Sequence, residues 1–174
     1  MRFVTIVQAS AFVPVWLRVL LLMAAGAKVW GAGIYSGCYF GSKDVTMGLG
    51  TFVNRGVLFD GTAPITLGRQ VAVGHRAQFI TSTHEIGPSD GRGGRVVDRP
   101  IVVGDGCWIG AGAIILPGVT VGDGCVIGAG TVVTRDCEPN GLYAGSPAPI
   151  QHPSPTTIGR STTRPPRPSL GPIS

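Results

Sequence analysis

The sequence predicts a single all-β domain built as a solenoid of short coils, and three observations lead to this prediction. Large aliphatic residues recur every six positions through residues 97–136, a period that fits neither a helix nor a simple strand. A smaller residue follows four positions after nearly every one of them. The 174 residues also include 28 glycines and only 13% charged side chains, a composition that suits tightly turned coils. Each unit would form one side of a three-sided coil, and stacked coils would share one apolar interior.

The repeat in residues 97–136 runs without a slip. Its large positions are Val97, Val103, Ile109, Ile115, Val121, Ile127 and Val133. Its second positions, smaller apart from Ile101, are Ile101, Cys107, Ala113, Val119, Cys125, Thr131 and Cys137. We expect the three cysteines to lie in the core as free thiols, because free cysteine is among the most buried residue types. The chain has no CxxC or Cys–His metal spacing, so we expect a reducing compartment and no bound metal.

An apolar segment near the start of the chain, residues 11–25, carries one charge, Arg18. We expect a short helix here, with Ser10 as its N-cap and Gly26 as its stop. The N-terminal helical segment, residues 1–28, would then pack against the base of the solenoid.

A signal peptide is the alternative for this start. Arg2 precedes the apolar run, and residues 25–27 resemble the small-residue site at which such peptides are cleaved. A membrane span is not expected, because the run is short and a charge interrupts it.

The solenoid domain is expected over residues 29–150, and its first half repeats less evenly. Six further repeats precede residue 97, with an eight-residue step after the third. With the seven above they make 13 repeats, a little over four coils, which would stack ~4.8 Å apart as paired strands. Their large positions are Met47, Val53, Phe59, Leu67, Val73 and Phe79.

The repeat is lost between Phe79 and Val97. Residues 84–95 contain four glycines, a proline and charges of both signs. A long excursion from a regular solenoid is more often functional than structural. We therefore expect a mobile, protruding loop over residues 84–96, with His84 at its start.

The C-terminal end differs in composition from the solenoid. Residues 151–174 contain six prolines, eight serines or threonines and no aromatic residue, which predicts a disordered tail. Most of the net charge of +5 comes from this tail, because residues 1–150 hold 11 basic and 9 acidic side chains. Without a basic stripe and interleaved aromatic residues, nucleic acid is not expected as a partner.

The residue just before each large position should point outward, and many of these residues are apolar. An apolar row on the outside of a solenoid predicts a partner surface, for which self-association is the simplest explanation. Scattered exposed apolar residues are the alternative. His84 shares this outward phase, whereas His75 lies in a turn and His152 begins the tail. The apolar members are Phe52, Leu58, Val102, Trp108, Ile114, Val126 and Val132.

Five separate blocks resemble the hexapeptide-repeat acyltransferases, in the order that this family has them. The resemblance covers about residues 29–150 and is closest to the maltose, galactoside and nodulation-factor O-acetyltransferases, with similarity to streptogramin acetyltransferases. It implies a left-handed parallel β-helix and a homotrimer with each active site between two subunits. The blocks are NRGVLFDGTAPITLG (54–68), ITSTHEIGP (80–88), VGDGCWIGAGAIILPGVTVGDG (103–124), VIGAGTVVTRD (126–136) and AGSPA (144–148).

The resemblance also implies the chemistry. The histidine of the family's T-x-T-H block is the general base, and His84 matches it. A neutral imidazole would take the proton of an acceptor hydroxyl as its oxygen attacks the thioester of acetyl-CoA. Direct transfer needs no covalent enzyme intermediate, so the cysteines receive no nucleophilic role.

Three residues are implied at the acceptor. Asn54 matches a family residue near the acceptor, and Asp60 lies close to a family carboxylate, though Thr62 could take that place because the spacing differs. Asn and Asp also suit the corners of a β-helix without any function. Glu85 stands where many relatives have proline, and would orient the base or contact the sugar.

Coenzyme A contacts are implied on the later coils, largely through backbone groups, and Arg135 would contact a phosphate. The chain departs from the family after residues 144–148, where Pro149 stands near the place of a usual Arg or Lys. A cationic contact to the cofactor would then be missing or come from the tail. The matched positions are Trp108, Ala111, Ala129, Thr134 and Arg135.

The sequence therefore favours a cytoplasmic, acetyl-CoA-dependent O-acetyltransferase for a sugar or saccharide hydroxyl. The first alternative is the same chemistry on an antibiotic hydroxyl or on an amino-sugar nitrogen. A γ-type carbonic anhydrase on a similar β-helix would need three zinc histidines at suitable spacing, which His75, His84 and His152 do not supply. A β-helix scaffold that has lost its chemistry is the remaining alternative.

Overall fold

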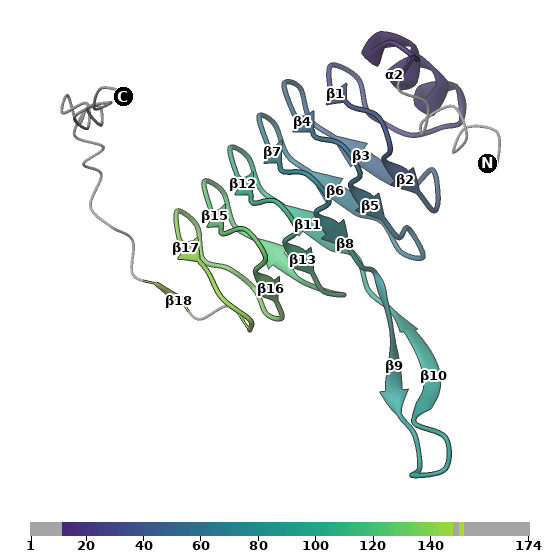
Figure 1. The fold of residues 1–174 in the computed structure, drawn as a ribbon, viewed down its shortest axis with the longest axis vertical. Coiled ribbons are helices and arrows are strands. Elements are labelled where there is room, and N and C mark those ends of the chain that lie inside the picture. Colours follow the sequence, from purple (N-terminus) through teal and green to yellow (C-terminus); the bar gives the residue numbers. More distant parts are fainter. Residues whose placement is uncertain (1–11, 148–149, 152–174) are drawn as a thin grey trace, which may run out of the picture.

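The computed structural model describes residues 12–147 and 150–151, and within them the chain forms one helix followed by a stack of β coils (Figure 1). Helix α2 (Val15–Ala24) lies at the N-terminal end of the stack and packs on strand β1. The predictions for Ser10, for a cleavable start around Arg2 and for residues 152–174 fall outside the described residues.

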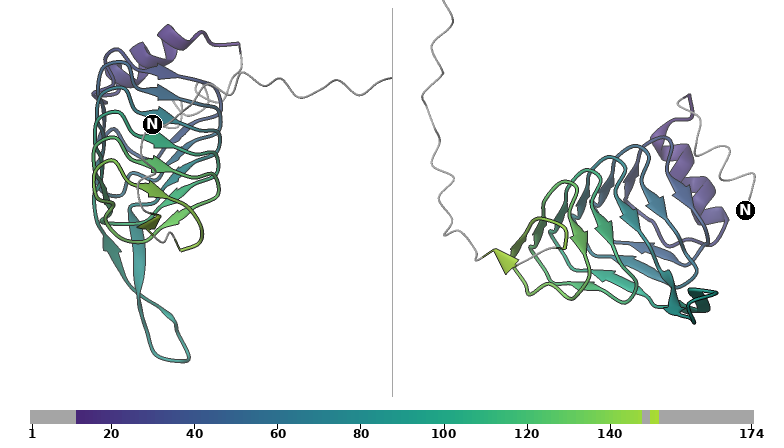
Figure 2. Two further views of the ribbon diagram at one scale, coloured as in Figure 1. Left: turned by 90° about the vertical axis from the view of Figure 1, so that its left-hand side faces the viewer. Right: turned by 60° about the horizontal axis from the view of Figure 1, so that its bottom comes forward.

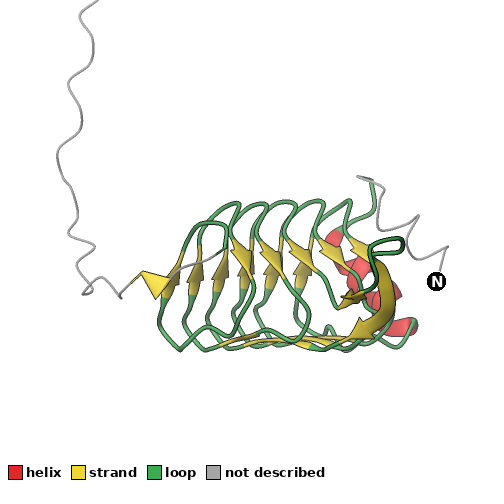
Figure 3. Ribbon diagram, turned by 90° about the horizontal axis from the view of Figure 1, so that it is seen from below, coloured by secondary structure: helices red, strands yellow, loops and turns green. Residues whose placement is uncertain are grey.

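Three parallel sheets form the walls of the coil, and the chain visits sheets 1, 2 and 3 in turn (Figures 2 and 3). Sheet 1 contains β1 (Gly33–Ile34), β4 (Phe52–Val53), β7 (Ala72–Val73), β12 (Trp108–Ile109), β15 (Val126–Ile127), β17 (Leu142–Tyr143) and the antiparallel β18 (Ile150–Gln151). Sheet 2 contains β2 (Tyr39–Phe40), β5 (Leu58–Phe59), β8 (Gln78–Phe79), β13 (Ile114–Ile115) and β16 (Val132–Val133). Sheet 3 contains β3 (Val45–Met47), β6 (Ile65–Leu67), β11 (Ile101–Val103) and β14 (Thr120–Val121).

The coil is longer than the sequence predicts. Six parallel strands of sheet 1, from β1 to β17, mark six levels in the described chain, against a little over four expected. The additional levels lie at the two ends of the stack. The six-residue period does not detect these levels, because the corners next to them are longer: Phe40 and Met47, and Val133 and Tyr143, are more than six residues apart.

The inward positions fill the core as predicted. Every large position from Met47 to Val133 except Val97 is buried, and so are the free thiols of Cys107, Cys125 and Cys137. Strands β2, β5 and β8 pair in register, which places their phenylalanines in one stack. The ring centroids of Phe40 and Phe59 lie 4.8 Å apart, and those of Phe59 and Phe79 lie 5.1 Å apart. Core positions thus join neighbouring coils through direct side-chain packing.

The excursion after β8 protrudes as expected, but it is an ordered hairpin and not an irregular loop (Figures 1 and 2). Strands β9 (Ser82–Ile86) and β10 (Gly93–Asp98) pair in an antiparallel ladder. This pairing satisfies the backbone N–H and C=O groups of a segment that has left the sheets. The phase assignment of Val97 is therefore wrong, because Val97 lies on β10 and is not in the core. The solenoid resumes at Ile101, which is fully buried.

Helix α2 is shorter than the apolar segment around it. It begins after Pro14 without a side-chain cap and ends before Gly26, whose φ of 100° suits the glycine stop that the sequence predicts. Leu22 and Arg18 are buried, and the Arg18 guanidinium donates to the Val13 carbonyl through Nε (3.0 Å) and Nη2 (2.7 Å). The described residues contain no helix with the length and apolar character needed to cross a membrane.

The outward apolar residues do not form a single row. Phe52, Trp108 and Val126 follow one another across sheet 1, whereas Leu58, Ile114 and Val132 lie on sheet 2 and Val102 lies on sheet 3. A six-residue period places a side chain inside or outside the coil, and the three-sided coil then distributes the outside positions over three walls. Sheet 1 carries the most exposed member, Trp108, which is 59% exposed.

One buried hydroxyl gives a stability prediction. Thr131 Oγ1 has no hydrogen-bond partner in the described structure, whereas Thr51 Oγ1 donates to the Gly68 carbonyl (2.7 Å) and accepts from the Val71 N–H (3.2 Å). We expect Thr131→Val to raise the free energy of unfolding by about 1 kcal/mol, because it removes a buried polar group that lacks a partner. Thr51→Val should lower it by about 1–3 kcal/mol. Urea denaturation of both variants at equal protein concentration measures the difference, and equal effects would contradict the assignment.

Candidate functional site

A hollow of about 450 Å³ lies where the hairpin leaves the coil. It forms at the edge between sheets 2 and 3, which we call the second edge; the edge between sheets 1 and 2 is the first edge. The hairpin supplies one side of the hollow and the corners of the next two coils supply the other. Its lining residues are Ile80, Ser82, Thr83, His84, Glu85, Val97, Arg99, Leu116, Pro117 and Thr134.

His84 is exposed on β9, and its ring is held by the other hairpin strand. Its Nδ1 lies 2.9 Å from the carbonyl oxygen of Gly94. A carbonyl can only accept, so Nδ1 is the donor in this contact, and a neutral imidazole held in this way would carry its lone pair on Nε2. Gly94 lies in the stretch between Gly93 and Val96 where the register of the hairpin shifts. A side chain at Gly94 would bring its Cβ within 2.7 Å of the Glu85 carbonyl oxygen, so glycine permits the close approach.

Asp60 lies beside the base of β9, and one of its two carboxylate oxygens accepts several hydrogen bonds from the chain that leads into the hairpin. Oδ2 accepts from the N–H of Thr81 (3.1 Å) and of Ser82 (3.2 Å), and from the hydroxyls of Thr81 (3.2 Å) and Ser82 (3.0 Å). The hydroxyl of Thr62 also reaches Oδ2, at 3.4 Å. Desolvation opposes ionisation here, but the hydrogen bonds from Ser82 and Thr81 outweigh it and hold the pKa of Asp60 below its ordinary value. This geometry places Asp60 as an anchor of the strand that carries His84.

The anchoring role gives a prediction for Asp60→Asn. An amide accepts more weakly than a carboxylate, so amide hydrogen exchange at residues 81–86 should quicken by about tenfold or more. The wild type should loosen in the same place as the pH falls below about 4. The stabilisation from Asp60 is complete above the pKa of the unfolded chain and is lost as the folded carboxyl takes up its proton at the lowered pKa.

Asp123→Asn is the matched control for this experiment. In the wild type, Asp123 Oδ1 accepts from the N–H of Asp105 (2.8 Å) at a different corner. The substitution therefore removes one carboxylate from the coil and leaves the contacts of the hairpin unchanged. Equal exchange rates for residues 81–86 in the two variants would contradict the anchoring role of Asp60.

Glu85 lines the hollow but already has a partner. Its carboxylate accepts from Arg95 Nη2 at 2.5 Å and from Arg95 Nε at 3.4 Å, across the hairpin from β10. Both side chains are at least half exposed, so the pair is worth little to stability. It nevertheless neutralises the carboxylate on this side of the hollow.

The remaining predicted site residues divide between the two edges. Thr134 and Arg135 lie on the second edge, and Thr134 joins His84 in the hollow. Asn54, Ala111 and Ala129 follow strands β4, β12 and β15 at the first edge. Trp108 projects outward from β12 next to that edge. The described chain therefore does not bring Asn54 or Trp108 to His84, because sheet 2 lies between the two edges.

Asn54 also makes the local contacts of a corner residue. Its Oδ1 accepts from the N–H of Arg55 (3.0 Å), and its carbonyl accepts from the buried Cys38 thiol (3.2 Å). A role at the acceptor would use the side-chain N–H₂ group, which has no contact in the described chain.

The buried cysteines are poorly suited to nucleophilic chemistry. Desolvation raises the pKa of Cys107 to about 11 and that of Cys137 to about 12. Both thiols are therefore protonated at neutral pH, and only the thiolate is a good nucleophile. Among the described residues, no group of three or more His, Cys, Asp and Glu side chains is placed to hold a metal ion.

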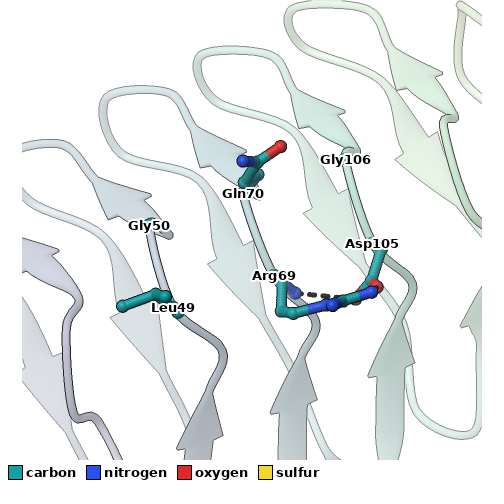
Figure 4. A pocket seen from close by; sticks show the side chains of 6 residues that line it. All are labelled: Leu49, Gly50, Arg69, Gln70, Asp105 and Gly106. Carbon is teal, nitrogen blue, oxygen red and sulfur yellow. Dashed lines mark hydrogen bonds and ion pairs between the residues drawn. The ribbon is translucent and has the colours of Figure 1, made fainter.

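A second hollow of about 460 Å³ lies on the third edge, between sheets 3 and 1, and holds none of the predicted site residues (Figure 4). Arg69 crosses it to Asp105, with Nε–Oδ2 and Nη2–Oδ2 distances of 2.9 and 2.6 Å. Asp105 Oδ1 also accepts from the Arg69 N–H at 2.7 Å. These contacts link successive coils, and the two charges cancel, so we assign this hollow a structural role.

The sequence does not predict that three further residues line the hollow around His84. Arg99, Leu116 and Pro117 enter it from the end of the hairpin and from the corner after β13. Their positions depend on how far the hairpin folds back over the next coil, which no six-residue period describes. The one sequence signal beside them is Gly118, where a Cβ would lie 3.0 Å from Arg99 Cδ.

The chain is similar in sequence to a known protein family and to several characterised proteins. Residues 100–135 match the family model described as bacterial transferase hexapeptide (six repeats). Nodulation protein L of Rhizobium meliloti is 42% identical over 114 residues, which cover 66% of this chain and 62% of that protein. The chain spans about half to three-fifths of the length of the curated relatives that it matches.

Solved structures are similar over most of the chain. A hexapeptide-repeat acetyltransferase from Vibrio cholerae has a TM-score of 0.72 and 31% identity, covering 87% of this chain and 86% of that one. The Vibrio protein has also been solved in complex with acetyl coenzyme A. A maltose O-acetyltransferase from Clostridium difficile has a TM-score of 0.74 and 28% identity, covering 89% and 84%. These matches identify the coil as the left-handed parallel β-helix implied by the resemblance.

Proposed function

This chain belongs to the hexapeptide-repeat transferase family, and from that premise we propose that it is an acetyl-CoA-dependent O-acetyltransferase for a sugar or saccharide hydroxyl. The observation that carries the proposal is the position of His84 in the lining of the hollow, with its Nδ1 held by the Gly94 carbonyl, so that Nε2 is the nitrogen left to act as a base. The complex of the Vibrio relative supports the donor. The maltose O-acetyltransferase supports the acceptor class.

His84 acts as the general base in this mechanism. Its Nε2 takes the proton of the acceptor hydroxyl while the oxygen attacks the thioester carbonyl, and the imidazolium returns the proton to the sulfur that leaves. The Gly94 carbonyl fixes the tautomer and stabilises the imidazolium through the Nδ1–H contact. Asp60 holds the strand beneath the base through Thr81 and Ser82.

The division of site residues between two edges supports a site shared by two subunits. A contact in a ring joins two different surfaces, and in the arrangement that we propose the first edge of one copy would meet the second edge of the next. Asn54, Trp108, Ala111 and Ala129 would then face His84 of a neighbour. Exposed apolar side chains on sheets 1 and 2 would lie in that contact. Light scattering that shows a monomer at micromolar concentration would contradict this arrangement.

The residues of the later coils would form the wall for coenzyme A. Trp108 offers an aromatic face, and backbone N–H groups at Ala111 and Ala129 lie on the same edge. Thr134 and Arg135 would supply a hydroxyl and a cation from the other edge. Buried free thiols and an acetyl-CoA donor both favour a cytoplasmic setting.

Thiol release from acetyl-CoA tests the proposal directly. The full chain is incubated with a panel of neutral sugars, oligosaccharides, amino sugars and a hydroxyl-bearing antibiotic, and the acetylated product is identified by mass. Acetyl esters of a sugar are expected. If only the amino sugar is acetylated, the acceptor is a nitrogen and not a hydroxyl. If no compound in the panel is acetylated, the alternative of a β-helix scaffold without catalytic activity is favoured.

A further inference from the structure

Arg99 is the one arginine or lysine among the residues that line the hollow around His84. It follows the hairpin directly, and its N–H donates to the Thr81 carbonyl at 2.8 Å, which ties it to the base of β9. Its side chain is exposed. The described residues form two ion pairs, Arg69–Asp105 and Arg95–Glu85, and neither includes Arg99.

The stem of Arg99 is held against the coil by a glycine. Gly118 has a φ of 84°, and a Cβ at that position would lie 3.0 Å from Arg99 Cδ and 3.3 Å from Arg99 Cβ. The stem therefore lies flat on the corner after Leu116 and Pro117. The absence of a side chain at Gly118 leaves room for the Arg99 stem beside the hollow.

The charges around the hollow leave Arg99 uncompensated. The Glu85 carboxylate is the one acidic group that lines it, and Arg95 already neutralises that carboxylate. A guanidinium offers five N–H donors in a planar fork that matches a phosphate or carboxylate. No side-chain partner of Arg99 is found among the described residues, so its guanidinium is available to an anionic ligand in the hollow.

We propose that Arg99 is an anion-binding residue of the reaction site, where it holds a phosphate or carboxylate of a bound substrate. This inference rests on the proposed function, because the hollow is treated as the place of transfer. Both substrates reach it, since His84 faces the acceptor and Thr134 is expected at the cofactor. The anion is thus either a phosphate of coenzyme A or an acidic group on the acceptor, and the chemistry of recognition is the same.

Calorimetric titration separates the two sources. Coenzyme A is titrated alone into wild type, Arg99→Gln, Arg99→Lys and Arg92→Gln; D-glucuronate and neutral glucose are then titrated in saturating coenzyme A. Arg99→Gln should weaken the binding of coenzyme A or of glucuronate by about tenfold or more, because a charge-assisted hydrogen bond is lost. Arg99→Lys should restore part of the affinity, since it keeps the charge but not the fork.

Arg92→Gln is the matched control. It removes the same charge from the tip of the same hairpin, where Arg92 Nη1 donates to the Gly87 carbonyl (3.3 Å), outside the hollow. Its affinities should equal those of the wild type, and all variants should share one melting temperature because both arginines are exposed.

Each outcome decides the proposal. A loss confined to coenzyme A assigns Arg99 to the cofactor, and a loss confined to glucuronate assigns it to an acidic acceptor. The proposal is overturned if Arg99→Gln binds both as the wild type does, or if the wild type binds neither. If the wild type binds either ligand but transfers no acetyl group, the transferase proposal is wrong. The difference in affinity between the wild type and Arg99→Gln still tests the role of Arg99 in that case.

Discussion

His84→Ala is expected to lower the rate of acetyl transfer by about 10²–10⁴-fold, the usual contribution of a general base. The loss should fall mainly on kcat, because the imidazole accepts a proton only as the acceptor oxygen attacks. Fold and assembly should persist, since the His84 side chain is exposed and makes one hydrogen bond, to the Gly94 carbonyl. Initial rates of thiol release from acetyl-CoA, with the acceptor found in the panel, measure the effect.

Two controls separate a lost base from a damaged hairpin. Ile86→Ala changes an 86% exposed side chain two residues further along β9 and should keep the rate close to that of the wild type. Added imidazole should restore part of the activity of His84→Ala, because it can occupy the vacated space and accept the proton. Wild-type turnover by His84→Ala would rule out the assignment of the base.

Phe59→Ala should be the most destabilising single change that we predict, with a loss of about 3–5 kcal/mol in the free energy of unfolding. Phe59 is fully buried and lies between Phe40 and Phe79, with interplanar angles of 17° and 4°. Truncation removes contacts on both faces of the ring and leaves a cavity that spans three coils. A close-packed solenoid has little freedom to close that cavity.

Phe52→Ala is the matched control for the core change. It removes the same side chain from the outer face of sheet 1, where Phe52 is 38% exposed and contacts Tyr35 at a centroid distance of 5.1 Å. Its cost should be clearly smaller. Urea denaturation at one protein concentration compares the two, because the stability of an oligomer depends on concentration. Similar losses for both would refute the contribution of the stack.

The six-residue period is enough to predict much of this structure. It identified the solenoid, the inward position of nearly every large aliphatic residue, and the burial of Cys107, Cys125 and Cys137 as free thiols. These features follow from a local rule, because each repeat places its own two side chains inside the coil. The same rule located the excursion that carries His84.

The period could not predict which wall of the coil a residue occupies. Every repeat looks alike in sequence, but the coil has three walls, so the outward apolar residues were expected in one row and lie on three sheets. Irregular corners near Phe40 and Val133 hid whole coils for the same reason.

The spacing of neighbouring residues is sufficient to predict the frame of the solenoid and the position of its interruption. The tertiary structure alone decided the details of the site. Pairing of β9 with β10 brings the Gly94 carbonyl to His84, Asp60 reaches Ser82 across 22 residues, and Arg99 lies on Gly118 of the next coil. These contacts join segments that are distant in the chain, and their geometry depends on how a hairpin returns to a coil. That return is set by backbone hydrogen bonds and packing that no periodic pattern records.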